Sequence, residues 1–383
     1  MQFRCTFALW LFLFCLISPL AVTQVYTVTD LGPLVPTAIN TWGQVAGNRN
    51  GHAFIWTKAS GMRDLGTLAG GTFSRAVAIN DLGLVAGVAD GPGKVVSHNP
   101  DYPTIACNNL TQPFLWTRRR GMRGLGAIAL YGEISFYFAW CDLFYYATDI
   151  NMYGQVVGSN QDIDSYKWGF LWTRSDGMTL FADAYQTAAN GINNVGQVVG
   201  RTGEFELYHT SHAALWEKAL RTDLGTLDGA DPSWYYCSGA NSVNDLAEVV
   251  GWSARSSVGS CVSLEAVRAF IWKTGVGMQD LGALPGDASS VALKVNYFGQ
   301  VIGSSGNSVV WDSQDYSFEV IGRPFIWSQR TGMRDLNALI STNSGWVLNT
   351  ATGINIWGQI VGSGTRNGKP HGFLLTPKSP FQF

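Results

Sequence analysis

Short β-branched and apolar runs recur along the chain, and turns rich in asparagine and glycine separate them. One pattern occurs seven times: Ile/Val-Asn-x-x-Gly-x-Val-x-Gly, then a variable gap, then Phe-Ile/Leu-Trp. Self-similarity on this scale predicts repeated supersecondary units that bury their apolar faces against one another. The copies begin at Asn40, Asn80, Asn151, Asn193, Asn244, Asn296 and Asn355.

Each copy predicts four strands. Asparagine and glycine three positions apart favour a tight hairpin turn, as in Asn151-Met-Tyr-Gly154. The run Gln155–Gly158 then predicts a second strand and Phe170–Trp172 a third, and a fourth follows a Gly-Met turn, as in Met62–Gly66. The fifth copy places Ala247 at the glycine position, so its turn is expected to be strained or differently built.

Radial stacking around an axis is the arrangement that buries both faces of four-stranded units while leaving only short edges. The last repeat stops after its third strand, His371–Leu375, whereas Tyr26–Gly32 reads as a fourth strand without preceding partners. The sequence therefore predicts an all-β, seven-bladed β-propeller of four-stranded antiparallel blades, closed into a ring by the N-terminal strand. The long spacing from Asn80 to Asn151 leaves the blade count open by one.

The motifs His52-Ala-Phe-Ile-Trp56 and Gly61-Met-Arg-Asp-Leu-Gly66, with the Asn-x-x-Gly-Gln-Val-Val-Gly pattern, resemble a known family. This is the extracellular HAF-repeat family, named after its His-Ala-Phe motif and found mostly in secreted bacterial proteins. The resemblance covers nearly all of residues 24–383. It implies a secreted repeat protein, and it implies no shared activity or catalytic residue.

Residues 1–23 predict a secretory signal peptide, because Arg4 precedes an apolar run from Phe7 to Ile17 that is too short for a membrane span. No later stretch reaches the length of a membrane-spanning helix. We therefore expect residues 24–383 to form a single β-propeller domain in the extracellular medium or the periplasm.

Composition and charge limit the classes of partner that the protein is expected to bind. Charged residues make up 14% of the chain, 45 residues are glycine and the net charge is −2, which suits tight turns and buried strands. Nucleic-acid binding is not expected, because the basic residues are scattered and the one basic run, Arg118–Arg120, lies in a short repeat turn. We expect a monomer without a cofactor.

Four cysteines follow the signal peptide. In an oxidising compartment they predict two disulfides. Three connectivities are possible, and we predict Cys107–Cys141 and Cys237–Cys261 because these pairs tie neighbouring connections together.

Connections differ in length between the two ends of the predicted strands. The Asn-x-x-Gly and Gly-Met turns at one end are short, and we call this end the turn face. The other end, the loop face, carries all the long loops and all four cysteines, and binding residues usually reside on such loops. Its aromatic residues predict a stacking platform for a sugar or an anchor for a protein, although packing over the disulfides is the alternative. The candidates are Trp140, Tyr145, Tyr146, Trp168, Trp234, Tyr235 and Tyr236.

Two charged residues, Asp149 and Lys294, fall two positions before a repeat asparagine, on the predicted innermost strand. They are candidates for a polar site in the central channel, and an interblade ion pair is an equally good interpretation. The histidines show no metal-ligand spacing, and the loop from Asn160 lacks the glycine and glutamate of a calcium loop, so no metal site is expected.

The leading hypothesis is a non-enzymatic module that binds a glycan or protein partner on the loop face. A glycan hydrolase or lyase at the channel mouth is the first alternative, with four carboxylates available for it. These are Glu133, Asp142, Asp231 and Asp287. Familiar hydrolase and nucleotide-binding signatures are absent from the sequence. A structural extracellular scaffold is the second alternative.

Overall fold

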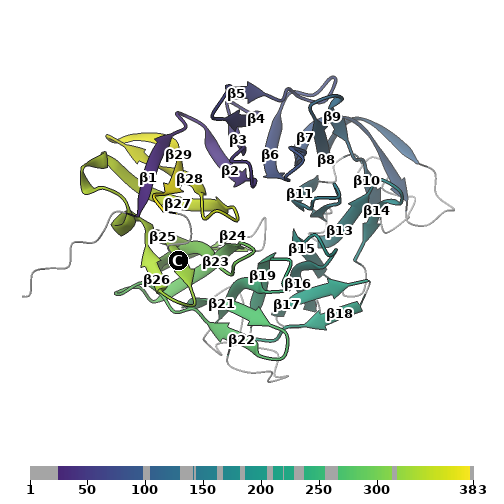
Figure 1. The fold of residues 1–383 in the computed structure, drawn as a ribbon. Helices are drawn as coiled ribbons and strands as arrows, with labels where there is room; N and C mark the ends of the chain where they lie inside the picture. Colours follow the sequence, from purple (N-terminus) through teal and green to yellow (C-terminus); the bar gives the residue numbers. More distant parts are fainter. Residues whose placement is uncertain are drawn as a thin grey trace, which may run out of the picture.

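The computed structural model describes residues 25–97, 104–129, 141, 144–161, 167–181, 186–204, 210–218, 220–227, 237–254, 266–312 and 317–379. The predicted signal peptide therefore lies outside the described residues. The described chain is all-β apart from two short 3-10 helices, η3 (Leu336–Leu339) and η4 (Thr342–Ser344). Its sheets follow one another in chain order around a common centre, as Figure 1 shows, so the architecture is propeller-like.

Four of the described sheets contain four antiparallel strands that are consecutive in the chain. The first holds β2 (Val35–Ile39), β3 (Val45–Arg49), β4 (His52–Thr57) and β5 (Gly61–Asp64). The next two hold β15 (Gln186–Ile192), β16 (Val198–Glu204), β17 (Thr210–Glu217) and β18 (Leu220–Asp223), then β19 (Ser238–Val243), β20 (Val249–Ala254), β21 (Val267–Lys273) and β22 (Gly277–Asp280). The fourth holds β23 (Ser289–Val295), β24 (Val301–Asp312), β25 (Ser317–Ser328) and β26 (Gly332–Asp335).

A further four-stranded sheet combines the two ends of the described chain. Strand β1 (Tyr26–Asp30) pairs antiparallel with β29 (Lys369–Pro377), beside β28 (Ile360–Arg366) and β27 (Trp346–Ile354). Asp30 binds His371 Nδ1 at 2.8 Å and Arg366 Nη1 at 2.6 Å. Burial pushes the pKa of Asp30 upward, but hydrogen bonds from Gly32 N–H, His371 and Arg366 outweigh it and hold the pKa below its usual range. The first strand is thus fixed by both backbone and side-chain contacts.

Separate four-stranded units were expected throughout, and one region differs. Nine strands form a single mixed sheet: β6 (Ser74–Ile79), β7 (Val85–Ser97), β8 (Ile105–Thr117), β9 (Gly121–Gly124), β10 (Ala127–Ala129), β11 (Phe144–Ile150), β12 (Val156–Gln161), β13 (Lys167–Thr173) and β14 (Gly177–Leu180). Strands β6 to β9 and β11 to β14 are two antiparallel units of the expected kind. They merge because β7 and β8 continue into the long loop as a hairpin, to which β10 and β11 add in parallel.

The second glycine of each motif copy lies opposite a β-bulge. In every repeat the innermost strand shifts register shortly before the Asn-x-x-Gly turn, for example between Ala189 and Gly191. The bulge brings a carbonyl of this innermost strand so close that a Cβ on Gly200 would lie 1.7 Å from Ala188 O. A side chain at this glycine would therefore break the hairpin.

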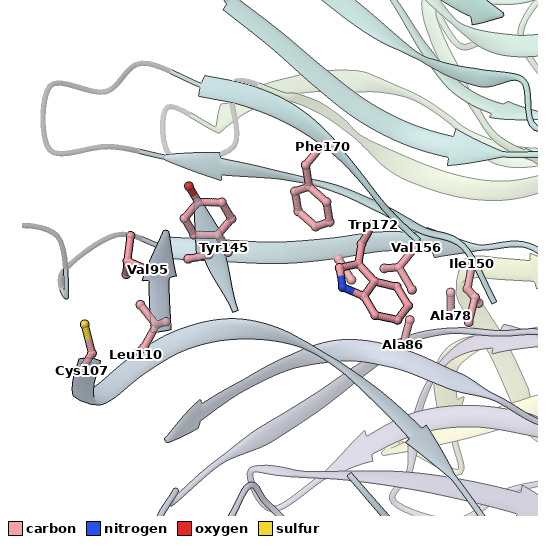
Figure 2. Close-up of a cluster of buried hydrophobic side chains, with 12 residues drawn as sticks. Ala78, Ala86, Val95, Cys107, Leu110, Tyr145, Ile150, Val156, Phe170 and Trp172 are labelled. Atoms are coloured by element: carbon pink, nitrogen blue, oxygen red, sulfur yellow. The ribbon is translucent and has the colours of Figure 1, made fainter. Parts of the chain in front are cut away.

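Hydrophobic clusters fill the spaces between neighbouring repeats. One cluster combines Ala78 and Ala86 of the second repeat with Tyr145, Phe170 and Trp172 of the third, as Figure 2 shows. The motif phenylalanine is fully buried in five repeats, including this one: Phe114, Phe170, Phe270, Phe325 and Phe373. These repeats thus bury their third strand against the preceding repeat, which explains why phenylalanine recurs there.

The turn at Ala247 has the same left-handed conformation as its glycine counterparts, with φ of 59°. An L-residue in this region is strained by roughly 1 kcal/mol. We expect Ala247→Gly to raise the free energy of unfolding by about 0.5–1 kcal/mol, measured by urea denaturation, because relief of strain exceeds the added entropy of the unfolded chain. Destabilisation by this substitution would contradict the strained-turn interpretation.

Candidate functional site

The repeat asparagines form a network around the centre of the molecule. In each copy the buried side chain accepts hydrogen bonds from the N–H groups two and four residues later, as Asn40 does from Trp42 and Gln44. The side-chain amide also donates to the backbone carbonyl of the next repeat asparagine, at 2.9–3.2 Å in all seven copies. Asn355 of the last repeat donates to Asn40 of the first. One side chain therefore both caps its turn and ties two repeats together.

A central cavity of about 240 Å³ lies inside this network and opens among the Asn-x-x-Gly turns. Asp149 and Lys294 both line it, as expected from the sequence. Their charged groups face one another, with Lys294 Nζ 3.7 Å from Asp149 Oδ2. Asp149 also accepts hydrogen bonds from the N–H groups of Ile150 and Ile192. The structure thus brings the pair together as an interblade ion pair across the cavity.

Large apolar side chains project from the turn face at the third position of every Asn-x-x-Gly turn. Their exposed fractions run from 51% at Trp357 to 74% at Trp42. We call this set the apolar crown, and it consists of Trp42, Leu82, Tyr153, Val195, Leu246, Phe298 and Trp357. Large apolar residues at a tight turn are normally replaced by small polar ones, so their recurrence requires an explanation.

The two tryptophans of the apolar crown are fixed in position. Trp42 Nε1 donates to Asp81 O at 2.9 Å, and Trp357 Nε1 donates to Thr41 O at 3.0 Å. Each indole therefore leans onto the turn of the next repeat. A fixed aromatic ring loses little conformational freedom when a ligand stacks on it.

Polar side chains accompany the apolar crown at the second position of four turns: Thr41, Asp81, Asn194 and Asp245. Thr41 donates its N–H and hydroxyl to the Asp81 carboxylate, and Asn194 makes the corresponding pair of hydrogen bonds to Asp245. The turn face therefore presents aromatic surface beside hydrogen-bonding groups that are held in place.

Three of the predicted loop-face aromatics, Tyr145, Tyr146 and Trp168, lie on strands β11 and β13 of one sheet. Tyr145 is fully buried, and its hydroxyl donates to Ile128 O and accepts from Asn160. Trp168 is 6% exposed, and Tyr146 is half-buried with Lys167 Nζ 5.9 Å from its ring centroid. These three side chains pack within the sheets because they lie on strands rather than in loops. The other predicted binding aromatics, Trp140, Trp234, Tyr235 and Tyr236, lie outside the described residues.

The disulfide Cys107–Cys141 is confirmed, with Cα atoms 5.6 Å apart. Cys237 is buried and disulfide-bonded, and its predicted partner Cys261 lies outside the described residues.

Of the candidate carboxylates, Asp287 binds Arg323 at 2.9 Å and Ser305 at 2.9 Å. Glu133, Asp142 and Asp231 lie outside the described residues.

Histidine recurs at the start of the third strand because it pairs with aspartate on the fourth. His52 Nδ1 lies 2.9 Å from Asp64, and His212 Nδ1 lies 2.9 Å from Asp223.

Within the part of the chain that the structure describes, no three histidine, cysteine, aspartate or glutamate side chains gather as metal ligands. Among the same residues, no helix has the length and apolar character needed to cross a bilayer.

The fold and the turn-face geometry define a propeller-like protein. The chain matches no protein-family model, and no curated protein matches it significantly. It is similar in structure to virginiamycin B lyase from Staphylococcus aureus, with a TM-score of 0.51 and 8% identity over 91% of this chain and 99% of the lyase. A streptogramin B lyase gives a TM-score of 0.50 at 8% identity, over 93% and 99% of the two chains. At this identity the similarity establishes the fold alone.

Proposed function

We propose that the protein is an exported, seven-bladed β-propeller that binds saccharides through its turn face. The seven-bladed ring is supported by the cyclic series of asparagine contacts, in which Asn355 reaches Asn40, and by the pairing of β1 with β29. Export is supported by the Cys107–Cys141 disulfide, since such bonds persist in oxidising compartments. The motif residues support membership of the HAF-repeat family.

The apolar crown is the observation that carries the saccharide proposal. Four of its seven members are aromatic: Trp42, Tyr153, Phe298 and Trp357. Sugar rings have apolar C–H faces and polar hydroxyl edges, so they bind where an exposed aromatic ring lies beside hydrogen-bonding groups. Trp42 and Trp357 meet this requirement, because each indole lies against a polar turn of the next repeat.

Catalysis gains no support from the described residues. Asp287, the described member of the four candidate carboxylates, pairs with Arg323, and Asp149 in the central cavity pairs with Lys294. Glycoside cleavage requires two carboxyl groups that can act on the bond from opposite sides. We therefore favour binding without turnover over the hydrolase or lyase alternative.

The test is a glycan and polysaccharide array with residues 24–383, followed by calorimetric titration of each hit. The double variant Trp42→Ala/Trp357→Ala is expected to bind at least about tenfold more weakly, because stacking on two aromatic rings is lost. Phe144→Ala is the matched control: Phe144 is 58% exposed but lies at the loop-face end of β11, so affinity should not change.

Each other outcome contradicts the proposal in a recognisable way. Loss of binding in Phe144→Ala with retention in the double variant would move the site to the loop face. Absence of saccharide binding by a folded sample would remove the saccharide proposal and favour a protein partner or a structural scaffold.

A further inference from the structure

A groove on the turn face separates the first and second repeats. It encloses about 350 Å³, and its walls come from the turns and third strands of both repeats. We call it the Trp42 groove, and the residues that line it include Trp42, Arg63, Asp81, Leu82, Trp116 and Arg118. A cavity of this size accommodates a small number of sugar units.

The aromatic side of the groove is Trp42. Its indole is 74% exposed and is held by the hydrogen bond from Nε1 to Asp81 O. Trp116 is 5% exposed and forms part of the packed base. Trp42 is therefore the ring that is accessible for stacking, whereas Trp116 supports the groove.

The groove also carries positive charge from two arginine side chains. Arg63 and Arg118 are both exposed, and neither forms an ion pair with any residue of the described segments. The Arg63 guanidinium carbon lies 5.3 Å from the Trp116 ring centroid, which holds that side chain against the groove. Two guanidinium groups that are not neutralised by carboxylates favour an anionic ligand.

Asp81 is the carboxylate among the lining residues, and it does not neutralise the arginines. Its two oxygens accept hydrogen bonds from Thr41 N–H at 2.8 Å and from Thr41 Oγ1 at 2.9 Å. The carboxylate is thereby directed to the neighbouring turn. The groove consequently combines one stacking surface with a net positive charge.

We propose that the Trp42 groove binds an acidic saccharide, with a sugar ring stacked on Trp42 and its carboxylate or sulfate group bound by Arg63 and Arg118. The inference rests on the proposed saccharide-binding function and specifies its ligand class. A uronate carboxylate and a sulfate group both present anionic oxygens that can accept hydrogen bonds from guanidinium groups, and the experiment distinguishes them.

The test is isothermal titration of residues 24–383 with three probes at low and high salt: tetragalacturonate, a sulfated galactan tetrasaccharide and the uncharged galactan tetrasaccharide. One of the acidic probes is expected to bind roughly tenfold more tightly than the neutral probe, and added salt should weaken only the acidic one. The probe that shows this preference identifies the anionic group.

The double variant Arg63→Gln/Arg118→Gln should remove this preference and its salt dependence while leaving affinity for the neutral probe unchanged. Arg174→Gln is the matched control, because Arg174 occupies in the third repeat the turn position of Arg118 and does not line the groove. It should leave every affinity unchanged. Thermal unfolding of each variant reports that the fold is retained.

Two results would overturn the inference and are separable from failure of the proposed function. Equal affinity for neutral and acidic probes, or an acidic preference that survives the double arginine substitution, would remove the acidic-saccharide site while saccharide binding stands. Binding of none of the probes, together with a silent array, would remove the saccharide function itself.

Discussion

Deletion of residues 24–32 is expected to lower the free energy of unfolding by about 3–6 kcal/mol. The deleted segment supplies Tyr26 of β1 and the following Leu31 to the buried interior, and burial of each large side chain stabilises the fold by roughly 1.5–3 kcal/mol. The deletion also exposes the edge of β29 and removes the Asp30 contacts with Arg366 and His371. Urea denaturation of residues 24–383 and of the deletion variant measures the difference.

Two controls make this result interpretable. Thr27→Ala changes an exposed residue of the same strand and should alter stability by less than about 0.5 kcal/mol. A synthetic peptide of residues 24–32 should restore the lost stability when added to the deletion variant. An unchanged unfolding midpoint after deletion would show that β1 does not hold the first and last repeats together.

Substitution of Asn355 by alanine is expected to destabilise the protein by about 2–4 kcal/mol. The change removes hydrogen bonds to Asn40 O and to Gln359 Oε1, and it leaves the N–H groups of Trp357 and Gln359 without their acceptor. Unsatisfied buried polar groups each cost about 1–3 kcal/mol, and several are created at once. Thermal and urea unfolding monitored by circular dichroism provide the measurement.

Asn343→Ala is the matched control for this substitution, because Asn343 is exposed and only its backbone N–H makes a described hydrogen bond. Asn193→Ala, which breaks the corresponding contact to Asn244 within the chain, should destabilise the protein to a similar extent. A loss below about 0.5 kcal/mol for Asn355→Ala would contradict a stabilising role for the asparagine network.

The strand content and the repeat boundaries could be predicted because each rests on a local signal. The turn Asn151-Met-Tyr-Gly154 contains its own hydrogen-bond acceptor and its left-handed glycine. The second function of Asn151, donation to Asn193 O, depends on how neighbouring repeats approach one another. The recurrence of asparagine in all seven copies is the one sequence signal for this bond between repeats, since aspartate or serine would suffice for the turn alone.

The nine-stranded sheet could not be predicted for a related reason. The pattern in the long gap after Gly87 indicates a loop, but β7 continues to Ser97 and pairs with β8 as far as Val95. Glycine and proline at positions 91–93 interrupt the strand pattern, and the register shift between Gly91 and Gly93 absorbs them. Only the tertiary pairing distinguishes such a bulged hairpin from an irregular loop.

The sequence places the candidate site on the loop face, whereas most of the exposed aromatic residues that the structure describes gather on the turn face. Aromatic density drew attention to Tyr145 and Trp168, but strand pleating directs both side chains into the packed interior. A signal for the turn face was present in the sequence, because the third turn position is large and apolar in every copy. Composition alone did not separate these two kinds of aromatic residue.

The same turns also separate the hydrogen-bonded framework from the exposed surface. At every third turn position the backbone N–H donates to the repeat asparagine, whereas the side chain points outward. Any residue except proline can satisfy that backbone bond. The molecule therefore offers seven positions at which the side chain can change without loss of this backbone bond, and the present set, from valine to tryptophan, is one of many combinations that this scaffold can display.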